Sequence, residues 1–372
     1  MKKLKIAVVG AGRLGGFHAQ KLLALPQVEL AAVVDPDPAA RERLAGACNC
    51  LALAEHAPLL GHVDAAVIAS PTRLHHAIAR DFLRAGTHLL VEKPLAATAD
   101  EAEELVRLAR DHADQRRPAL RDGARTVPGG GRRLVLQVGH VERFNPALTA
   151  VTAHLGQPRY IEAVRTSGFT FRSMDVGVVL DLMIHDIDLV LSLVGELPRR
   201  VEAMGTALLG RHEDVAHARL EFPGGCAATL VASRVAYETV RRIQLWSPRA
   251  MATLDLGART ATLVRPSATL LSGRFHADEL SAEQVAYYRE HLLAEHLPRE
   301  EQRFEAVDAL ALEVQDFVEA ILTPREPRVL GEAGRQAVLV AEQILERIAA
   351  APHAPAAIPF DRPALDPLRK AG

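Results

Sequence analysis

The 372-residue sequence has little of several features that mark particular classes of protein. Its three cysteines, Cys48, Cys50 and Cys226, are an odd number and too few for a disulfide framework or a four-thiolate metal site. Its 44 Lys and Arg residues nearly balance its 46 Asp and Glu residues, so no global field would attract nucleic acid or an acidic membrane. No uncharged run is long enough to span a bilayer. We therefore expect a soluble cytoplasmic protein that binds neither nucleic acid nor membrane.

The domain organisation follows from length and hydrophobic pattern. At 372 residues with 49% apolar content, the chain is too long for one ordinary core, which predicts two domains. In the first third, apolar strands at 4–9, 29–34 and 63–69 alternate with helical stretches, and this alternation predicts a doubly wound parallel sheet. We expect a first domain at 1–138, a second domain at 139–350 and a proline-rich surface tail at 351–372.

The stretch 114–133 interrupts the first domain with six arginines among prolines and glycines, without periodicity. An unstructured connection this long is uncommon inside a compact domain, so we interpret it as an insertion loop. A basic loop could grip phosphates, but no aromatic residues interleave with the arginines to stack on bases. A solvated loop is the favoured interpretation.

A glycine-rich turn supplies the cofactor prediction. The strand 4–9 runs into a GxGxxG turn, whose glycines permit a tight turn, close approach of a pyrophosphate and close packing of the following helix. The strand 29–34 ends in Asp35, where an acid accepts hydrogen bonds from an adenosine ribose and repels a 2′-phosphate. NAD is therefore favoured over NADP, although Arg41 is near enough to keep NADP open. The cofactor residues predicted here are Gly10, Gly12, Arg13, Leu14, Gly15 and Asp35.

Two further strands end on the same edge of the predicted sheet. The strand 63–69 runs into Ser70, Pro71 and Thr72, and the next strand ends at Lys93. Ligands of open α/β sheets bind at the carboxyl ends of the strands. We therefore place Ser70, Pro71 and Thr72 beside the cofactor and Lys93 near the reacting atoms. For Lys93 the alternative is a solvated surface lysine beside a turn.

A second group of ionisable residues lies on an otherwise apolar helix. Asp181, His185 and Asp188 stand at positions i, i+4 and i+7, which share one helix face. Such groups are costly in an apolar environment unless they are paired, bind a ligand or line a cavity. A metal site would want more nitrogen or sulfur ligands than the sequence offers, so no metal is predicted. A structural network around a core histidine, or an acid/base unit with a near-neutral imidazole, remain as interpretations.

Together these motifs resemble the Gfo/Idh/MocA oxidoreductase family. The resemblance rests on the glycine turn with His18 behind it, the turn from Pro71 to His75, Glu92-Lys93-Pro94 and the helix bearing Asp181, and it extends from the first strand to about Ile348. It implies a Rossmann domain followed by an α+β domain whose open, mainly antiparallel sheet often mediates dimers or tetramers. It also implies that Lys93, Asp181 and His185 match the family's catalytic residues. We add His75 and Glu92 to the predicted cofactor-binding residues.

Within the family, residues 139–146 and the arginines that follow are similar to bacterial enzymes that oxidise the 3-hydroxyl of UDP-N-acetylglucosamine for lipid A synthesis. A partner aminotransferase then converts the resulting ketone to an amine. A planar guanidinium suits a diphosphate, although each of these arginines could equally be an ordinary surface or sheet-face residue. Asn145 either meets a sugar hydroxyl or caps the turn before Pro146. The predicted substrate-binding residues are Arg143, Asn145, Arg165, Arg172 and Asp188.

The expected chemistry is NAD-dependent oxidation of a sugar hydroxyl, which couples loss of the hydroxyl proton to transfer of a hydride. His185 is the candidate base, held by Asp181, while a charged Lys93 stabilises the developing charge on oxygen. In an alternative assignment Lys93 itself accepts the proton. Three other functions stay open: an inositol or free-sugar dehydrogenase, a sensor that binds nucleotide without turnover, and an enzyme that retains NADP and dismutates sugars.

Overall fold

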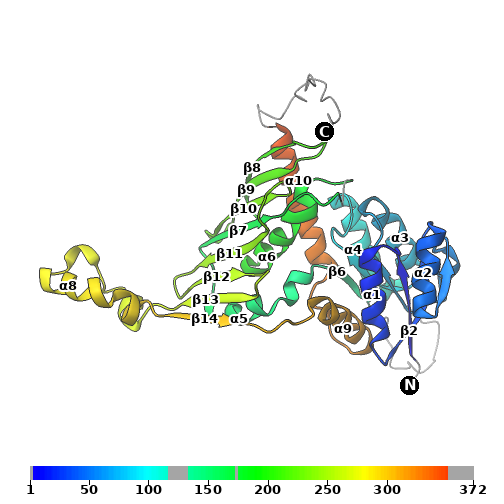
Figure 1. Ribbon diagram of the computed structural model, residues 1–372, viewed down its shortest axis with the longest axis horizontal. Coiled ribbons are helices and arrows are strands. Elements are labelled where there is room, and N and C mark those ends of the chain that lie inside the picture. The colour runs from blue at the N-terminus through cyan, green and yellow to red at the C-terminus, as the bar shows by residue number, and fades with distance from the viewer. Residues whose placement is uncertain (1–2, 116–132, 172–174, 351–372) are drawn as a thin grey trace, which may run out of the picture.

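The computed structural model describes residues 3–115, 133–171 and 175–350. Within these ranges the chain forms a Rossmann domain and a second domain built on a wide sheet, and the two lie side by side (Figure 1). Most of the predicted insertion at 114–133, the predicted substrate residue Arg172 and the predicted tail at 351–372 lie outside the described residues. Among the described residues, no helix combines the length and apolar character that crossing a membrane requires.

The first domain surrounds a six-stranded sheet in which every neighbouring pair of strands is parallel, in the order β3-β2-β1-β4-β5-β6. Its central strands are apolar and almost fully buried, as a sheet covered on both faces requires. This confirms the predicted doubly wound sheet. The strands are β1 Leu4–Val9, β2 Val28–Val34, β3 Leu51–Leu53, β4 Ala65–Ile68, β5 His88–Glu92 and β6 Leu136–Gly139.

Helices connect these strands and cover the sheet. Residue chemistry sets their starts, as at α2, where the Asp37 side chain accepts a hydrogen bond from the amide of Ala39 and a proline follows at the first helical position. The helices between the strands are α1 Arg13–Leu23, α2 Pro38–Cys48, the 3-10 turn η1 Ala57–Leu59, α3 Thr72–Arg84 and α4 Ala99–Gln115.

A helix from late in the chain also belongs to this domain. In α9 (Ala309–Leu322), Val314, Phe317 and Val318 are fully buried in one apolar cluster with Val8 of β1 and Leu22 of α1. The chain therefore returns to the Rossmann domain after building most of the second domain. The predicted division at residue 139 does not include this return, because the contact joins segments about 300 residues apart and leaves no local pattern in the sequence.

The second domain contains an open sheet of eight strands, ordered β14-β13-β12-β11-β7-β10-β9-β8. Only β7 and β10 pair in parallel, which confirms the predicted mainly antiparallel sheet. The strands are β7 Tyr160–Thr166, β8 Arg200–Thr206, β9 Val215–Glu221, β10 Ala227–Ser233, β11 Val240–Trp246, β12 Met251–Asp255, β13 Thr260–Val264 and β14 Arg299–Arg303.

Burial alternates along these strands, because one face of the sheet packs on helices and the other is open. The helices on the packed face are α5 Pro146–Leu155, α6 Ile184–Val194 and α10 Gly331–Ala350. Two short segments precede α5 and α6, the 3-10 turn η2 Val141–Phe144 and the π-helix η3 Val179–Met183. Helix α10 contacts both β8 and α4, so it joins the two domains.

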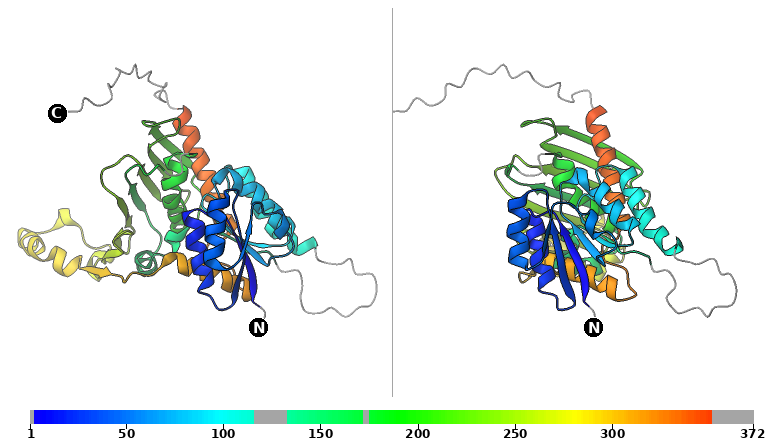
Figure 2. Two further views of the ribbon diagram at one scale, coloured as in Figure 1. Left: turned by 45° about the vertical axis from the view of Figure 1, so that its right-hand side comes forward. Right: turned by 90° about the vertical axis from the view of Figure 1, so that its right-hand side faces the viewer.

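A long arm separates β13 from β14 and projects away from the rest of the molecule (Figures 1 and 2). It consists of α7 Ala268–Leu271, the 3-10 turn η4 Ala277–Glu279, α8 Ala282–His291 and the π-helix η5 Leu292–His296. None of these four segments has a buried residue. The arm therefore has no core of its own within this chain.

Candidate active site

A cavity of about 850 Å³ lies where β1, β2 and β4 end, at the edge of the sheet predicted to hold the cofactor. Seven of the predicted cofactor residues line it: Gly10, Gly12, Arg13, Leu14, Asp35, Ser70 and Pro71. The lining also includes His56 and Arg73, which the sequence analysis missed. Arg73 directly follows the predicted Thr72, and this position next to the end of β4 could have indicated that it lines the cavity.

The geometry of the glycine turn agrees with the roles expected for its residues. Gly10 has φ +105°, and a Cβ there would lie 2.5 Å from the carbonyl oxygen of Ala69. A Cβ at Gly15 would lie 1.8 Å from the carbonyl oxygen of Gly10, so α1 can pack this closely only without a side chain. The turn thus aims the amino-terminal end of α1 at the cavity, where its free amides and dipole favour an anion.

Asp35 stands between the glycine turn and the predicted ribose position. Its Oδ2 accepts a hydrogen bond from the amide of Ala11 at 2.7 Å, and its Oδ1 accepts one from the amide of Asp37 at 2.9 Å. A carboxylate offers about four acceptor positions, so two remain for ribose hydroxyls. Arg41 donates to the carbonyl of Pro36 at 3.0 Å, which keeps a cation close to the same position.

His75 and Glu92 are placed differently from the prediction, and neither lines the cavity. His75 is buried, with Nδ1 2.8 Å from the carbonyl oxygen of Pro94 and Nε2 2.8 Å from that of Ser70. Burial lowers the pKa of His75. Glu92 points into the interior, where its Oε1 lies 2.6 Å from Nε2 of His18. In the structure both residues fix strand ends, and their direct contact with cofactor stays a prediction.

Lys93 contacts the second domain directly. Its Nζ donates to the backbone carbonyl of Asp181 at 2.6 Å and lies 3.3 Å from Oδ1 of the same residue. The side chains of Lys93 and Asp181 are 17% and 22% exposed, so both reach the solvent-facing side of the domain junction. Its contacts with Asp181 show that Lys93 is not simply a solvated surface lysine. The amine stands at the carboxyl end of β5 and faces η3 of the other domain.

His185 lies beside this pair, but Asp181 does not hold it as predicted. Among the described residues, Nδ1 of His185 is buried without a hydrogen-bond partner, and Asp181 pairs with Lys93 instead. The physical reason is that residues 179–183 form a π-helix, whose wider turn shifts the i, i+4 alignment expected from an α-helix. Burial, followed by the charges of Lys93 and Arg165, lowers the pKa of His185 well below its usual value. The imidazole is therefore neutral at neutral pH, and the same burial and charges oppose its protonation.

Two predicted substrate residues form an ion pair. Nε of Arg143 donates to Oδ2 of Asp188 at 2.8 Å, and Asp188 is almost fully buried whereas Arg143 is 20% exposed. Asp188 is therefore in position to orient Arg143, and its predicted contact with substrate stays a prediction. Only the terminal nitrogens of Arg143 remain for a substrate.

Arg165 and Asn145 have structural partners in place of the predicted substrate. Arg165 is 4% exposed; its Nε and Nη2 bind Asp186 as a fork at 2.8 to 3.1 Å, and its Nη1 donates to Glu142 at 2.9 Å. Asn145 caps α5 by accepting from the amide of Ala147, and its side-chain nitrogen donates to the carbonyl of Leu256. The capping alternative for Asn145 is thus the one found. The predicted binding roles of both residues stay predictions, which these internal contacts do not support.

Arg241 is a cation near the site that the sequence analysis missed. It lies on β11 opposite Arg165 of β7, its side chain is 50% exposed, and its Nη1 is 3.9 Å from Oε1 of Glu142. Its charge also contributes to the lowered pKa of His185. The signal available in the sequence was weak, because Arg241 and Arg242 are adjacent in an ordinary alternating strand.

A nucleotide-binding cavity at the strand ends of a Rossmann sheet, with a lysine at the end of the next strand and a neutral histidine at the domain junction, is the arrangement of an NAD-dependent oxidoreductase. Residues 4–117 match the oxidoreductase family with an NAD-binding Rossmann fold, and residues 147–252 match the GFO/IDH/MocA C-terminal domain. The chain is 34% identical to UDP-N-acetylglucosamine 3-dehydrogenase of Acidithiobacillus ferrooxidans, over 92% of this chain and 97% of that protein.

A solved structure of that enzyme aligns with a TM-score of 0.76 at 32% identity, covering 94% of this chain and 99% of the other. An inositol 2-dehydrogenase of Rhizobium meliloti is 28% identical over 56% of this chain and 60% of its own length. The chain therefore belongs to the Gfo/Idh/MocA family of oxidoreductases. Its cofactor is NAD, as the sequence analysis predicted.

Proposed function

We propose that the protein oxidises the 3-hydroxyl of a UDP-linked N-acetyl amino sugar to a ketone with NAD. The single observation that carries the proposal is the meeting of Lys93, Asp181 and His185 across the domain junction, at the end of β5, whose neighbour β4 ends at the cofactor cavity. The nearly full-length similarity to a UDP-N-acetylglucosamine 3-dehydrogenase supports this substrate class. The inositol dehydrogenases match a smaller part of the chain, which disfavours a free polyol.

The mechanism follows from the charge states of the two groups. NAD, held by the glycine turn and Asp35, supplies the acceptor for the hydride. We assign the hydroxyl proton to His185, which is neutral and so has a free ring lone pair, although its lowered pKa makes it a weak base. The Lys93 amine, anchored by the carbonyl of Asp181, donates to the same oxygen and stabilises the negative charge that develops there. Lys93 as the proton acceptor remains the alternative assignment.

The diphosphate of the substrate needs cations outside the buried network. Arg143 and Arg241 have partly exposed guanidinium groups on the side of the second domain that bears His185, and we propose that they hold the diphosphate. The predicted contribution of Arg172 stays a prediction.

A 3-ketosugar is the substrate class of an aminotransferase, so we propose that such an enzyme consumes the product, as in lipid A-type amino sugar synthesis. Three free cysteines support a reducing cytoplasm.

We also propose a homo-oligomer, dimer or tetramer, that covers the arm. Leu293 and Tyr287 of the arm are 74% and 44% exposed, and such apolar side chains on a segment without a core indicate a contact surface. Light scattering should show an oligomer whose mass falls on Leu293→Asp substitution. Leu51→Asp, at a 64% exposed position of the first domain, is the matched control. A monomeric wild-type protein would refute this proposal.

The test of function is turnover of a substrate panel. Purified protein is incubated with NAD and either UDP-N-acetylglucosamine, other UDP-sugars, myo-inositol or free hexoses, while absorbance of the reduced cofactor is followed. We expect turnover of UDP-N-acetylglucosamine, with the keto product identified by mass spectrometry. Turnover confined to free polyols would remove the UDP-sugar assignment, and NAD binding without any turnover would favour a sensor.

A further inference from the structure

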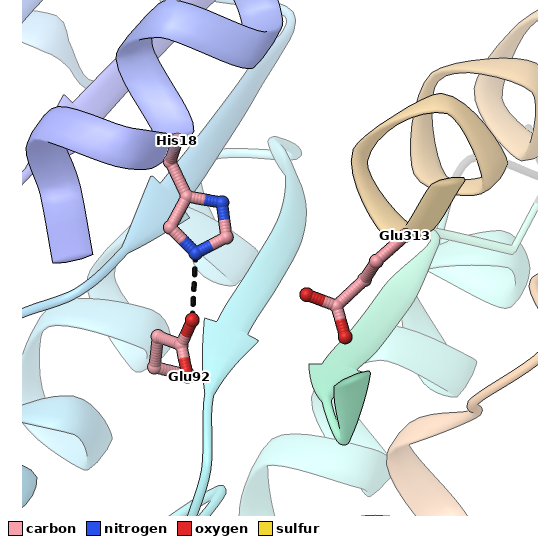
Figure 3. Close-up of side chains that lie close together, drawn as sticks. All are labelled: His18, Glu92 and Glu313. Atoms are coloured by element: carbon pink, nitrogen blue, oxygen red, sulfur yellow. Dashed lines mark hydrogen bonds and ion pairs between the residues drawn. The ribbon is translucent and has the colours of Figure 1, made fainter. Parts of the chain in front are cut away.

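Three ionisable side chains meet in the interior behind Lys93, although they come from distant parts of the chain (Figure 3). His18 belongs to α1, Glu92 is the last residue of β5, and Glu313 lies on α9. His18 and Glu313 are 0% exposed and Glu92 is 6% exposed. Nε2 of His18 lies 2.6 Å from Oε1 of Glu92, and one nitrogen or oxygen atom from each of the three residues lies within 4.8 Å of the others.

Glu313 has no partner for its carboxylate among the described residues. Both of its oxygens are buried without a hydrogen bond, and its carboxylate points towards the pair formed by His18 and Glu92 (Figure 3). Burial, and then the charge of Glu92, raises the pKa of Glu313 well above its usual value. An ionised carboxylate in this position would cost several kcal/mol without a compensating charge.

Two neighbouring atoms lack partners as well. Nδ1 of His18 is buried without a hydrogen bond, and so is Oε1 of Gln137, whose side-chain nitrogen donates to the backbone carbonyl of Glu313 at 3.0 Å. A proton on Glu313 would satisfy one carboxyl oxygen and leave the other oxygen without a donor. A cation between Glu313 and the pair formed by His18 and Glu92 would instead compensate the charge of the Glu313 carboxylate.

We propose that His18, Glu92 and Glu313 bind one divalent transition-metal ion, of the Zn²⁺ or Mn²⁺ class. One imidazole nitrogen and two carboxylate oxygens suit such an ion, and two carboxylates balance its charge inside the protein. Metal–ligand bonds of about 2.0–2.2 Å require ligand atoms within about 4.4 Å of one another. The present spacing is up to 4.8 Å, so the ligand atoms would have to approach by about 0.4 Å on binding.

The ion would have a positioning role and would not touch the substrate. It joins α1, whose start forms the nucleotide turn, to the strand end that carries Lys93 and to α9 from the end of the chain. The proposal is independent of the substrate proposed above. The sequence analysis predicted no metal, because the three ligands are separated by 74 and 221 residues and form no spaced motif.

The experiment measures metal binding by the full chain without a histidine tag. After chelation and desalting, the protein is titrated with zinc chloride or manganese chloride, bound metal is counted by mass spectrometry, and the melting temperature is recorded. We expect about one ion per chain and a melting temperature that falls on chelation and recovers with metal. Glu313→Gln should abolish both effects.

Glu104→Gln is the matched control, because Glu104 forms a similar pair with His76, at 2.9 Å, without a third carboxylate. It should bind metal as the wild type does. X-ray absorption of the zinc-loaded protein should show only nitrogen and oxygen ligands, including one imidazole. Absence of binding by the wild type, or unchanged binding by Glu313→Gln, would overturn the proposal. Loss of binding only in His185→Asn would place the ion at the catalytic residues and overturn it too.

Discussion

Replacing Arg165 by methionine tests whether this arginine supports the structure or binds substrate. The guanidinium is 4% exposed and neutralises Asp186 and Glu142 through contacts of 2.8 to 3.1 Å. Removing one member of a buried ion pair leaves the remaining charge uncompensated, which costs about 3–5 kcal/mol. Total stabilities are only about 5–15 kcal/mol, so this is a large fraction. A urea slope of about 3 kcal/mol per M would lower the unfolding midpoint by about 1 M or more.

Urea unfolding followed by circular dichroism measures this change. The matched control is Arg242→Met, because Arg242 lies on the neighbouring strand, is 48% exposed and approaches Glu162 only to 3.8 Å. An exposed pair of this kind contributes at most about 1 kcal/mol. Removing the partner as well, in Arg165→Met with Asp186→Leu, should restore part of the lost stability, because no unpaired Asp186 charge then stays buried.

Steady-state kinetics supply the refuting result. If Arg165 held the substrate diphosphate, its methionine variant would keep the wild-type unfolding midpoint while KM for the UDP-sugar rose tenfold or more. We expect the reverse pattern: the urea midpoint of unfolding falls, and KM for the UDP-sugar changes less than tenfold. The kinetics are measured at low temperature, where the destabilised variant stays folded. A stable variant with a raised KM would return Arg165 to the substrate site.

Three further predictions address the cofactor, the catalytic amine and pH. Lys93→Met should lower kcat about 10²–10³-fold with NAD affinity unchanged by calorimetry, because it removes one donor to the developing oxyanion; near-normal turnover would contradict its role. Asp35→Ala should reduce the ratio of kcat/KM for NAD over NADP, and an unchanged ratio would remove Asp35 from the ribose contact. Burial lowers the pKa of His140, so the unfolded chain takes up a proton below pH 6.5 that the folded protein excludes. Stability is therefore lost as pH falls, and His140→Asn should flatten this loss by up to about 1.4 kcal/mol per pH unit; equal urea-unfolding slopes between pH 5.5 and 7 would refute the effect.

Local patterns predicted the Rossmann half of the fold because each of its signals is short-range. The strand 4–9 was predicted with the bounds that the structure gives, since its apolar run stops at a glycine turn. The return of α9 to the first domain could not be predicted in this way. Its buried residues match any amphipathic helix, and only the complete fold decides which core they join.

At the candidate site, sequence motifs predicted several of the residues that meet there but not the direction of every side chain. Lys93 and His185 were predicted from the chemistry they carry, and both lie at the domain junction. Asp181 was assigned to His185 from α-helical spacing, which the π-helix at 179–183 alters. Arg165 was assigned to substrate because its buried partners are 21 and 23 residues away, so the sequence could not show that its charge was already neutralised.

The residues that face the domain junction are adjacent in sequence to buried ionic residues. At three positions, a residue that faces the domain junction has an acidic neighbour in the sequence. The acid points inward, where a buried arginine or histidine side chain binds it. The pairs are Lys93 with Glu92, His185 with Asp186, and Arg143 with Glu142. Adjacent residues point to opposite faces of a strand and about 100° apart on a helix, so anchoring one restricts the other.

This coupling explains why ionic groups are buried next to a reactive site although hydrophobic residues of similar volume often stabilise a fold as well or better. The anchored acid restricts the backbone on which its neighbour is carried, and catalysis depends on such restriction, since misplacement by about 1 Å can cost 10²-fold in rate. Asp186→Asn should therefore lower kcat even though Asp186 never reaches the cavity. Because His185 is the group displaced, the loss should appear in kcat more than in KM for NAD, whose binding residues lie in the other domain.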